Sequence, residues 1–152
     1  EKADALWGFP ELTIEYLLQC PKYKINFHNA RPETTSFTHN YIDAGNGLLV
    51  GHWDKIASEA GYTAKAIRDK YCADIIQGHT HRVGYVAKTY GKKVKIGAEI
   101  GCMCSSPPQE TDANWQLGFT VVYQKDDKNY IYPVNIREDY SFISPEGKYF
   151  CL

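Results

Sequence analysis

The stretch Ala73-Asp74-Ile75-Ile76-Gln77-Gly78-His79-Thr80-His81-Arg82 decides the fold of this chain. Its first half is short, uncharged after Asp74 and mostly apolar, which is typical of a strand covered on both faces. Gly78 permits a sharp turn, and two histidines follow it. The pattern predicts a buried strand that delivers His79 and His81 just beyond its C-terminal end.

A second stretch, Leu48-Leu49-Val50-Gly51-His52, has the same design. Three of the five histidines therefore follow the ends of two predicted strands. In open α/β sheets this rim is where ligands bind, and neutral imidazole is a common ligand for transition metals. A histidine beside a strand is more often a surface or hydrogen-bonded residue, and that interpretation is kept for His28 and His39. For His52, His79 and His81 the repeated pattern favours metal binding.

Between these two stretches the sequence predicts a helix over 64–71, capped by Thr63. Ile67 and Tyr71 are expected to face the sheet, whereas Lys65, Arg68 and Asp69 are expected to lie in water, with a weak pair between Lys65 and Asp69. This helix makes the region a strand–helix–strand unit.

The remaining segments predict a short helix over 11–19, a strand over 25–27, and antiparallel strands elsewhere. Asn46-Gly47 predicts a hairpin turn rather than a metal ligand. The antiparallel strands are expected over 83–89, 94–96, 117–123 and 130–136, with loops over 29–40 and 104–111. Trp115 and Phe119 are expected to be structural and to pack beside the segment 101–104.

The composition indicates a folded protein: 152 residues, 43% hydrophobic, with a net charge of −1. This charge argues against a generally basic nucleic-acid surface, and no apolar run reaches the length of a membrane span.

The five scattered cysteines favour a reducing, cytoplasmic compartment. Cys102 and Cys104 are interpreted as small buried side chains near the site. Because the chain begins at Glu1, a processed, trimmed or partial chain is expected.

Val50-Gly51-His52 and Gly78-His79-Thr80-His81-Arg82 resemble the last two motifs of the calcineurin-like metallophosphoesterase family. The stretches Gly101-Cys102-Met103-Cys104 and Asn114-Trp115-Gln116-Leu117-Gly118-Phe119 resemble a branch common among phage and bacterial phosphoesterases. The resemblance covers about residues 45–137. It implies an α/β fold, the C-terminal half of an αββα sandwich, with mixed and antiparallel strands and few helices. Residues 1–152 would then be a single or a partial domain.

The resemblance implies two divalent metal ions (Mn, Fe, Zn or Ni), one bound by His52 and His79 and the other by His81. The family's Asp-x-His, Gly-Asp-x-x-Asp and Gly-Asn-His motifs do not occur in this sequence. No catalytic or substrate-binding residue is therefore assigned, and three neutral histidines do not balance two dications. We expect an N-terminal half that was trimmed, left out, or supplied by another chain.

The expected function is hydrolysis of phosphomonoesters or phosphodiesters, with nucleotides and nucleic acid among the substrates considered. The alternative is a non-catalytic phosphoesterase-like module that serves as a binding or assembly surface. The intact Gly-His-Thr-His sequence favours the enzyme, whereas the missing N-terminal motifs favour the module.

Overall fold

The computed structural model describes residues 14–25, 41–104 and 114–151, and the chain divides into two compact units, 1–35 and 36–152. In the first unit, helix α1 (Ile14–Leu17) leads into turns, and the Ile25 N–H donates to the Cys20 carbonyl at 2.8 Å. Of the predicted helix over 11–19, residues 14–17 are helical, 18–19 form turns, and 11–13 lie outside the described residues. The predicted loop over 29–40 and most of the strand over 25–27 lie outside the described residues. No helix in the described ranges is both long and apolar enough to cross a membrane.

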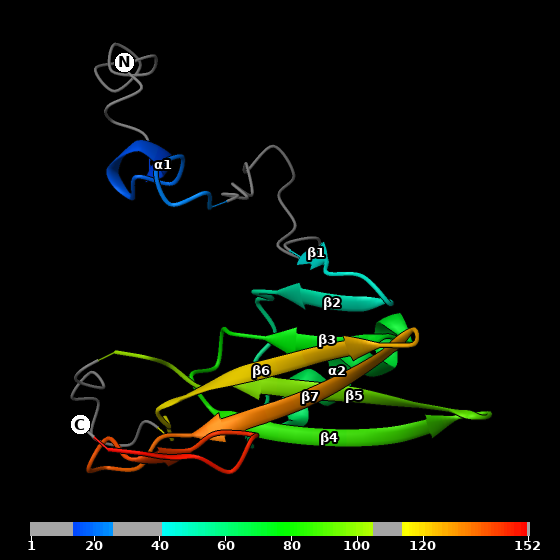
Figure 1. Ribbon diagram of the computed structural model, residues 1–152. Helices are drawn as coiled ribbons and strands as arrows, with labels where there is room; N and C mark the ends of the chain where they lie inside the picture. Colours follow the sequence, from blue (N-terminus) through cyan, green and yellow to red (C-terminus); the bar gives the residue numbers. More distant parts are fainter. Residues whose placement is uncertain (1–13, 26–40, 105–113, 152) are drawn as a thin grey trace, which may run out of the picture. The chain divides into compact units, whose positions relative to one another are not determined.

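The second unit is built on a mixed five-stranded sheet with the order β1-β2-β3-β5-β4 (Figure 1). Strands β2, β3 and β5 run parallel, whereas β1 and β4 are antiparallel to their neighbours. The predicted strands over 48–50 and 73–78 are confirmed. The strand bounds are β1 (Tyr41–Asp43), β2 (Leu48–Gly51), β3 (Asp74–Gln77), β4 (Val83–Tyr90) and β5 (Lys93–Ile100).

Helix α2 (Tyr62–Tyr71) joins β2 to β3 and covers one face of this sheet, which confirms the strand–helix–strand unit. Trp53, Ile67 and Ile75 form the core between the helix and the sheet. Gly97 of β5 lets the helix approach closely, because a Cβ there would lie 2.8 Å from the Ala64 carbonyl oxygen.

Two details of the predicted helix are wrong. Thr63 does not cap it: the helix begins after Gly61, and the Thr63 hydroxyl accepts a hydrogen bond from the Ala57 N–H. Arg68 is buried rather than exposed, and its guanidinium donates two hydrogen bonds to the neighbouring Asp69. The predicted pair between Lys65 and Asp69 is confirmed at 3.1 Å.

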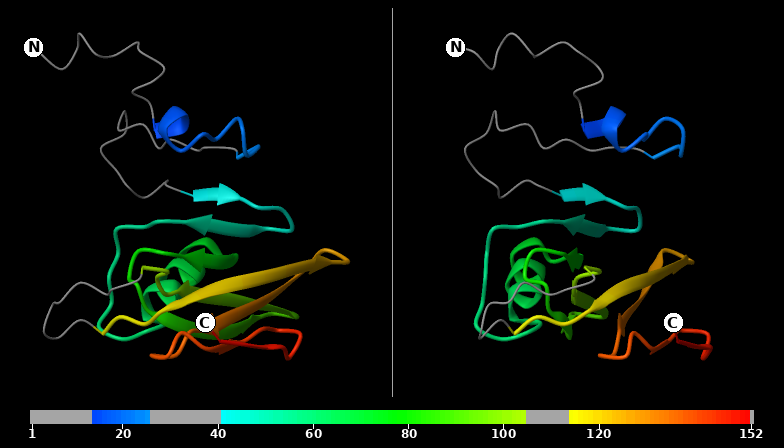
Figure 2. Two further views of the ribbon diagram at one scale, coloured as in Figure 1. Left: turned by 60° about the vertical axis from the view of Figure 1, so that its left-hand side comes forward. Right: turned by 90° about the vertical axis from the view of Figure 1, so that its left-hand side faces the viewer.

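The hairpin of β6 (Gly118–Lys125) and β7 (Lys128–Asn135) lies on the opposite face of the sheet from α2 (Figure 2). A second core lies between hairpin and sheet, and its buried members are Leu48, Ile76, Ala98 and Ile131. Adjacent residues Ile75 and Ile76 thus point into different cores, as strand alternation requires. A short pair, β8 (Phe142–Ile143) and β9 (Tyr149–Phe150), follows the hairpin. The fold is mixed α/β, with few helices and a mixed sheet, as predicted.

The turn between β1 and β2 is the predicted hairpin turn at Asn46-Gly47. Both residues have positive φ, 52° and 65°, as this class of tight turn requires. The Leu48 N–H donates to the Gly45 carbonyl and closes the turn. The register set here pairs Asp43 with Leu49 and brings Gly51, at the end of β2, to the edge of the sheet where β3 also ends.

Candidate metal centre

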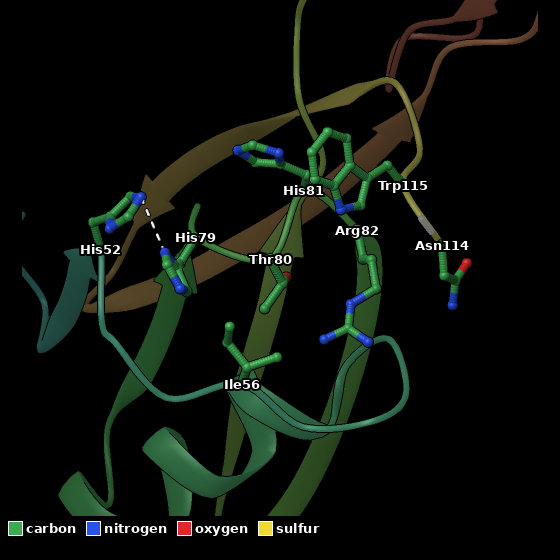
Figure 3. A pocket seen from close by; sticks show the side chains of 8 residues that line it. All are labelled: His52, Ile56, His79, Thr80, His81, Arg82, Asn114 and Trp115. Atoms are coloured by element: carbon green, nitrogen blue, oxygen red, sulfur yellow. Dashed lines mark hydrogen bonds between the residues drawn. The ribbon is translucent and has the colours of Figure 1, made fainter. Parts of the chain in front are cut away.

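A pocket of about 550 Å³ opens at the edge of the sheet where the parallel strands β2 and β3 end. Ligand sites in open α/β sheets occupy this position. All three histidines predicted as ligands line the pocket (Figure 3). Its lining residues are His52, Ile56, His79, Thr80, His81, Arg82, Asn114 and Trp115.

His52 and His79 are brought together by the pairing of β2 with β3. Gly51 lies opposite Gln77 in the register, and the Gly78 N–H donates to the Gly51 carbonyl at 3.2 Å. The two imidazoles consequently approach edge to face, with ring centroids 4.6 Å apart. His79 Nδ1 lies 3.4 Å from His52 Nε2, and Figure 3 shows the two rings facing each other.

This separation fits a shared cation. Two nitrogens bound tetrahedrally to one metal at about 2.0–2.1 Å lie roughly 3.3–3.4 Å from each other. Burial lowers the pKa of His79 below its ordinary value of 6.5, and the neighbouring charges of His52 and His81 lower it further, while Asp54 acts in the opposite direction. The lowered pKa favours the neutral form of His79, which is the form that binds metals.

His81 faces a different neighbour. Its backbone is left-handed, with φ of 55°, and its ring meets that of Trp115 edge to face at 4.7 Å between centroids. Within the described ranges, no group of three or more His, Cys, Asp or Glu side chains is arranged to hold a metal ion. The structure thus brings His52 and His79 into contact and places His81 in the same pocket. Metal binding by the three residues stays a prediction.

Glu99, which no sequence pattern indicated, supports the histidine loop (residues 78–82). Its side chain is fully buried on β5, and Oε1 accepts from the backbone N–H groups of Thr63 and Ala64 at the start of α2. Oε2 accepts from the Thr80 hydroxyl at 2.6 Å and lies 3.7 Å from Arg82 Nε. Glu99 therefore replaces the missing N-terminal cap of the helix and fixes the residue between the two loop histidines.

Arg82 completes this support from the other side of the loop. Its guanidinium donates to the carbonyl oxygens of Ala57 and Ser58, which lie in the connection between β2 and α2. The side chain is almost fully buried although it borders the pocket. The Gly-His-Thr-His-Arg segment is thus tied both to β5 and to the connection before α2.

The segment that carries Trp115 runs between the histidine loop and the end of β5. The Gln116 N–H donates to the His81 carbonyl, and the Gln116 carbonyl accepts from the Cys102 N–H. Trp115 is half-buried and lines the pocket, whereas Phe119 packs against Phe142 at 5.2 Å between centroids. The structural role assigned to Trp115 stays a prediction.

One expectation beside the site is wrong. Cys102 is half-buried, but Cys104 is exposed, because the chain leaves the sheet after Cys102. Most of the predicted loop over 104–111 lies outside the described residues. His28 and His39 also lie outside them, so their surface interpretation is not tested.

Comparisons with known proteins identify no family for this chain. No protein-family profile matches it, and no curated protein matches it. Among solved structures, a single mutant of Vps29 from Entamoeba histolytica is similar, with 18% identity and a TM-score of 0.42. The likeness covers 74% of this chain, which spans 57% of the length of that protein. At this level the likeness carries no conclusion about activity.

Proposed function

We propose that His52 and His79 bind a divalent cation, with His81 at a neighbouring position, and that this pocket serves metal-dependent hydrolysis of phosphoesters. The contact between His52 and His79 at the ends of two adjacent parallel strands carries the proposal. The resemblance of both Gly-His sequences to metallophosphoesterase motifs supports the choice of reaction. Mn, Fe, Zn and Ni are the metals considered, because each accepts mixed imidazole and carboxylate ligands.

A bound divalent cation supplies Lewis-acid polarisation of a phosphoryl oxygen and an acidified water. The residues of this chain hold and orient the ligands. His79 presents a neutral nitrogen because burial lowers its pKa. Glu99 holds the Thr80 hydroxyl and thereby fixes the residue between His79 and His81. Trp115 covers one side of His81 and restricts the position of that ring.

The pocket needs further ligands for a centre with two cations. A bridging carboxylate is the usual means of offsetting the repulsion of two dications. Asp54 is close enough to act on the charge of His79, but the described residues contain no group of three ligands. We propose that acidic ligands come from a segment outside the described residues or from a second polypeptide.

The alternative is a phosphoesterase-like module that binds a partner without catalysis. The orientation of His81 toward Trp115 favours it, because that ring is engaged by an aromatic neighbour rather than by a second ligand group. The two functions differ in one respect that is simple to measure. The enzyme hydrolyses phosphoesters once its acidic ligands are present, whereas the module does not.

The test is hydrolysis of bis(4-nitrophenyl) phosphate with added Mn²⁺. We expect the isolated 152 residues to be inactive, and a longer form or a second polypeptide that carries the acidic motifs to restore hydrolysis. His79→Ala should abolish the restored activity, while the exposed Lys65→Ala on α2 should retain it. If the protein with its acidic motifs supplied binds Mn²⁺ but does not hydrolyse the substrate, the result would favour the non-catalytic module. Robust Mn²⁺-dependent hydrolysis by the isolated chain would contradict the proposed division of ligands.

A further inference from the structure

Two cysteine sulfurs lie in contact at the end of β5, outside the histidine pair. Cys102 Sγ and Cys104 Sγ are 3.5 Å apart, and both thiols are free. Cys104 is exposed, Cys102 is half-buried, and Met103 between them points its side chain into solvent at 75% exposure. The sulfurs need to approach by about 1.5 Å to reach the length of a disulfide bond.

We infer that Cys102 and Cys104 form a redox-active dithiol. A small-molecule disulfide such as glutathione disulfide oxidises this dithiol to an intramolecular disulfide. The exposed Cys104 thiolate attacks one sulfur of glutathione disulfide, forms a mixed disulfide and releases the first glutathione thiol. The Cys102 thiolate then attacks the Cys104 sulfur, and the second glutathione thiol leaves. Two protein thiols lose two electrons and two protons in total, and one glutathione disulfide becomes two thiols.

The different surroundings of the two sulfurs indicate that Cys104 reacts first and Cys102 second. Cys104 is accessible to a tripeptide, whereas Cys102 is held against the Gln116 carbonyl, with Sγ at 3.6 Å from that oxygen. Burial raises the pKa of Cys102, which makes it the slower nucleophile. Because the Cys102 sulfur lies beside Cys104, it reaches the mixed disulfide without a large movement of the chain.

The dithiol is connected to the histidine pocket through the backbone. Cys102 exchanges hydrogen bonds with both neighbours of Leu117: its N–H donates to the Gln116 carbonyl, and its carbonyl accepts from the Gly118 N–H. Gln116 in turn donates to the carbonyl of His81. A change at Cys102 and Cys104 is therefore expected to reach His81 through a single intervening residue.

The experiment incubates the folded chain with glutathione disulfide, blocks the remaining thiols under denaturing conditions and analyses tryptic peptides by mass spectrometry. The peptide 96–125 contains Cys102 and Cys104 and no other cysteine. We expect this peptide to lose two hydrogens in the wild type and to carry no glutathione. Cys102→Ser should instead trap one glutathione on Cys104. The exposed Cys72 serves as the internal reference for unassisted glutathionylation.

The connection between the dithiol and the pocket is tested by comparing the NMR chemical shifts of the histidine rings in the reduced and the oxidised protein. We expect the His81 signal to move and that of His52, which contacts His79, to stay in place. A wild type that keeps a stable glutathione on Cys104, or joins either cysteine to Cys20, Cys72 or Cys151, would overturn the dithiol assignment. Disulfide formation without movement of the His81 signal would overturn its connection to the pocket. Both readouts are independent of phosphoester hydrolysis.

Discussion

The two sides of the pocket use histidines from one short motif in different ways. His79 meets His52 with ring nitrogens 3.4 Å apart, whereas His81, two residues later, packs against Trp115. The difference arises from the neighbouring backbone: His79 follows β3 directly beside β2, while His81 has a left-handed conformation and bonds to the segment of Gln116. The spacing of two histidines in a motif therefore does not show that both bind one metal. The neighbouring strands and segments determine which side chain each imidazole contacts.

The largest effect is expected at Glu99, which supports both sides of the pocket. Glu99→Ala removes a buried carboxylate that binds the start of α2, Thr80 and Arg82. Because the buried Arg82 then loses its ionic partner, we expect the free energy of unfolding to fall by about 3–5 kcal/mol. Urea denaturation measures it, with the exposed Glu59→Ala as control. An unfolding free energy within about 1 kcal/mol of the wild type would contradict the role given to Glu99.

A smaller effect is expected on the side of His81. Trp115→Ala removes the edge-to-face contact with His81, and such contacts contribute about 0.5–1.5 kcal/mol beyond the area they bury. Trp115→Phe retains an aromatic edge and should lose less of the free energy of unfolding. Loss of substrate affinity by Trp115→Ala at unchanged stability would instead assign Trp115 to substrate binding.

The smallest effect is the contribution of His79 to the pH dependence of the free energy of unfolding. The pKa of His79 is lowered in the folded protein, so the unfolded chain binds its proton at higher pH. Stability contributed by neutral His79 is thus present above the ordinary value of 6.5 and is lost as the pH falls through the folded pKa. NMR titration of the ring measures this directly. A His79 that titrates above 6.5 would show that burial does not control its charge.

The sequence predicted the parts of the site that depend on local patterns. The apolar run before His79 and the Asn46-Gly47 turn are short-range signals, and both appear as expected. Glu99 was missed because the predicted strand ended at residue 96, whereas β5 continues to Ile100 and turns Gly97 and Glu99 toward α2. In the structure α2 covers that side, so the buried carboxylate binds the helix instead of water. Gly97, next to Glu99 on this face, was the available signal that a helix approaches there.

The contact between His81 and Trp115 was also beyond sequence reasoning. It joins residues that are far apart in the sequence, and it depends on the hydrogen bonds of Gln116 to both His81 and Cys102. Periodicity predicts which face of a strand a side chain occupies, but it does not predict which loop lies over the end of that strand. All three histidines line one pocket, but their shared metal binding stays a prediction, and the different neighbours of His79 and His81 required the structure.

The most direct test of the metal centre is a titration with Co²⁺, followed by visible absorption and calorimetry. We predict that one cation binds per chain, at His52 and His79. Mutation of a residue that only hydrogen-bonds to a metal ligand usually lowers metal affinity by about 10–100-fold. Removal of a ligand itself should cost more, so His52→Ala and His79→Ala should each weaken Co²⁺ binding by more than about 100-fold. His81→Ala should weaken it by about tenfold or less, and Lys65→Ala should have no effect. Equal affinity in His79→Ala and the wild type would contradict the metal centre proposed for this pocket.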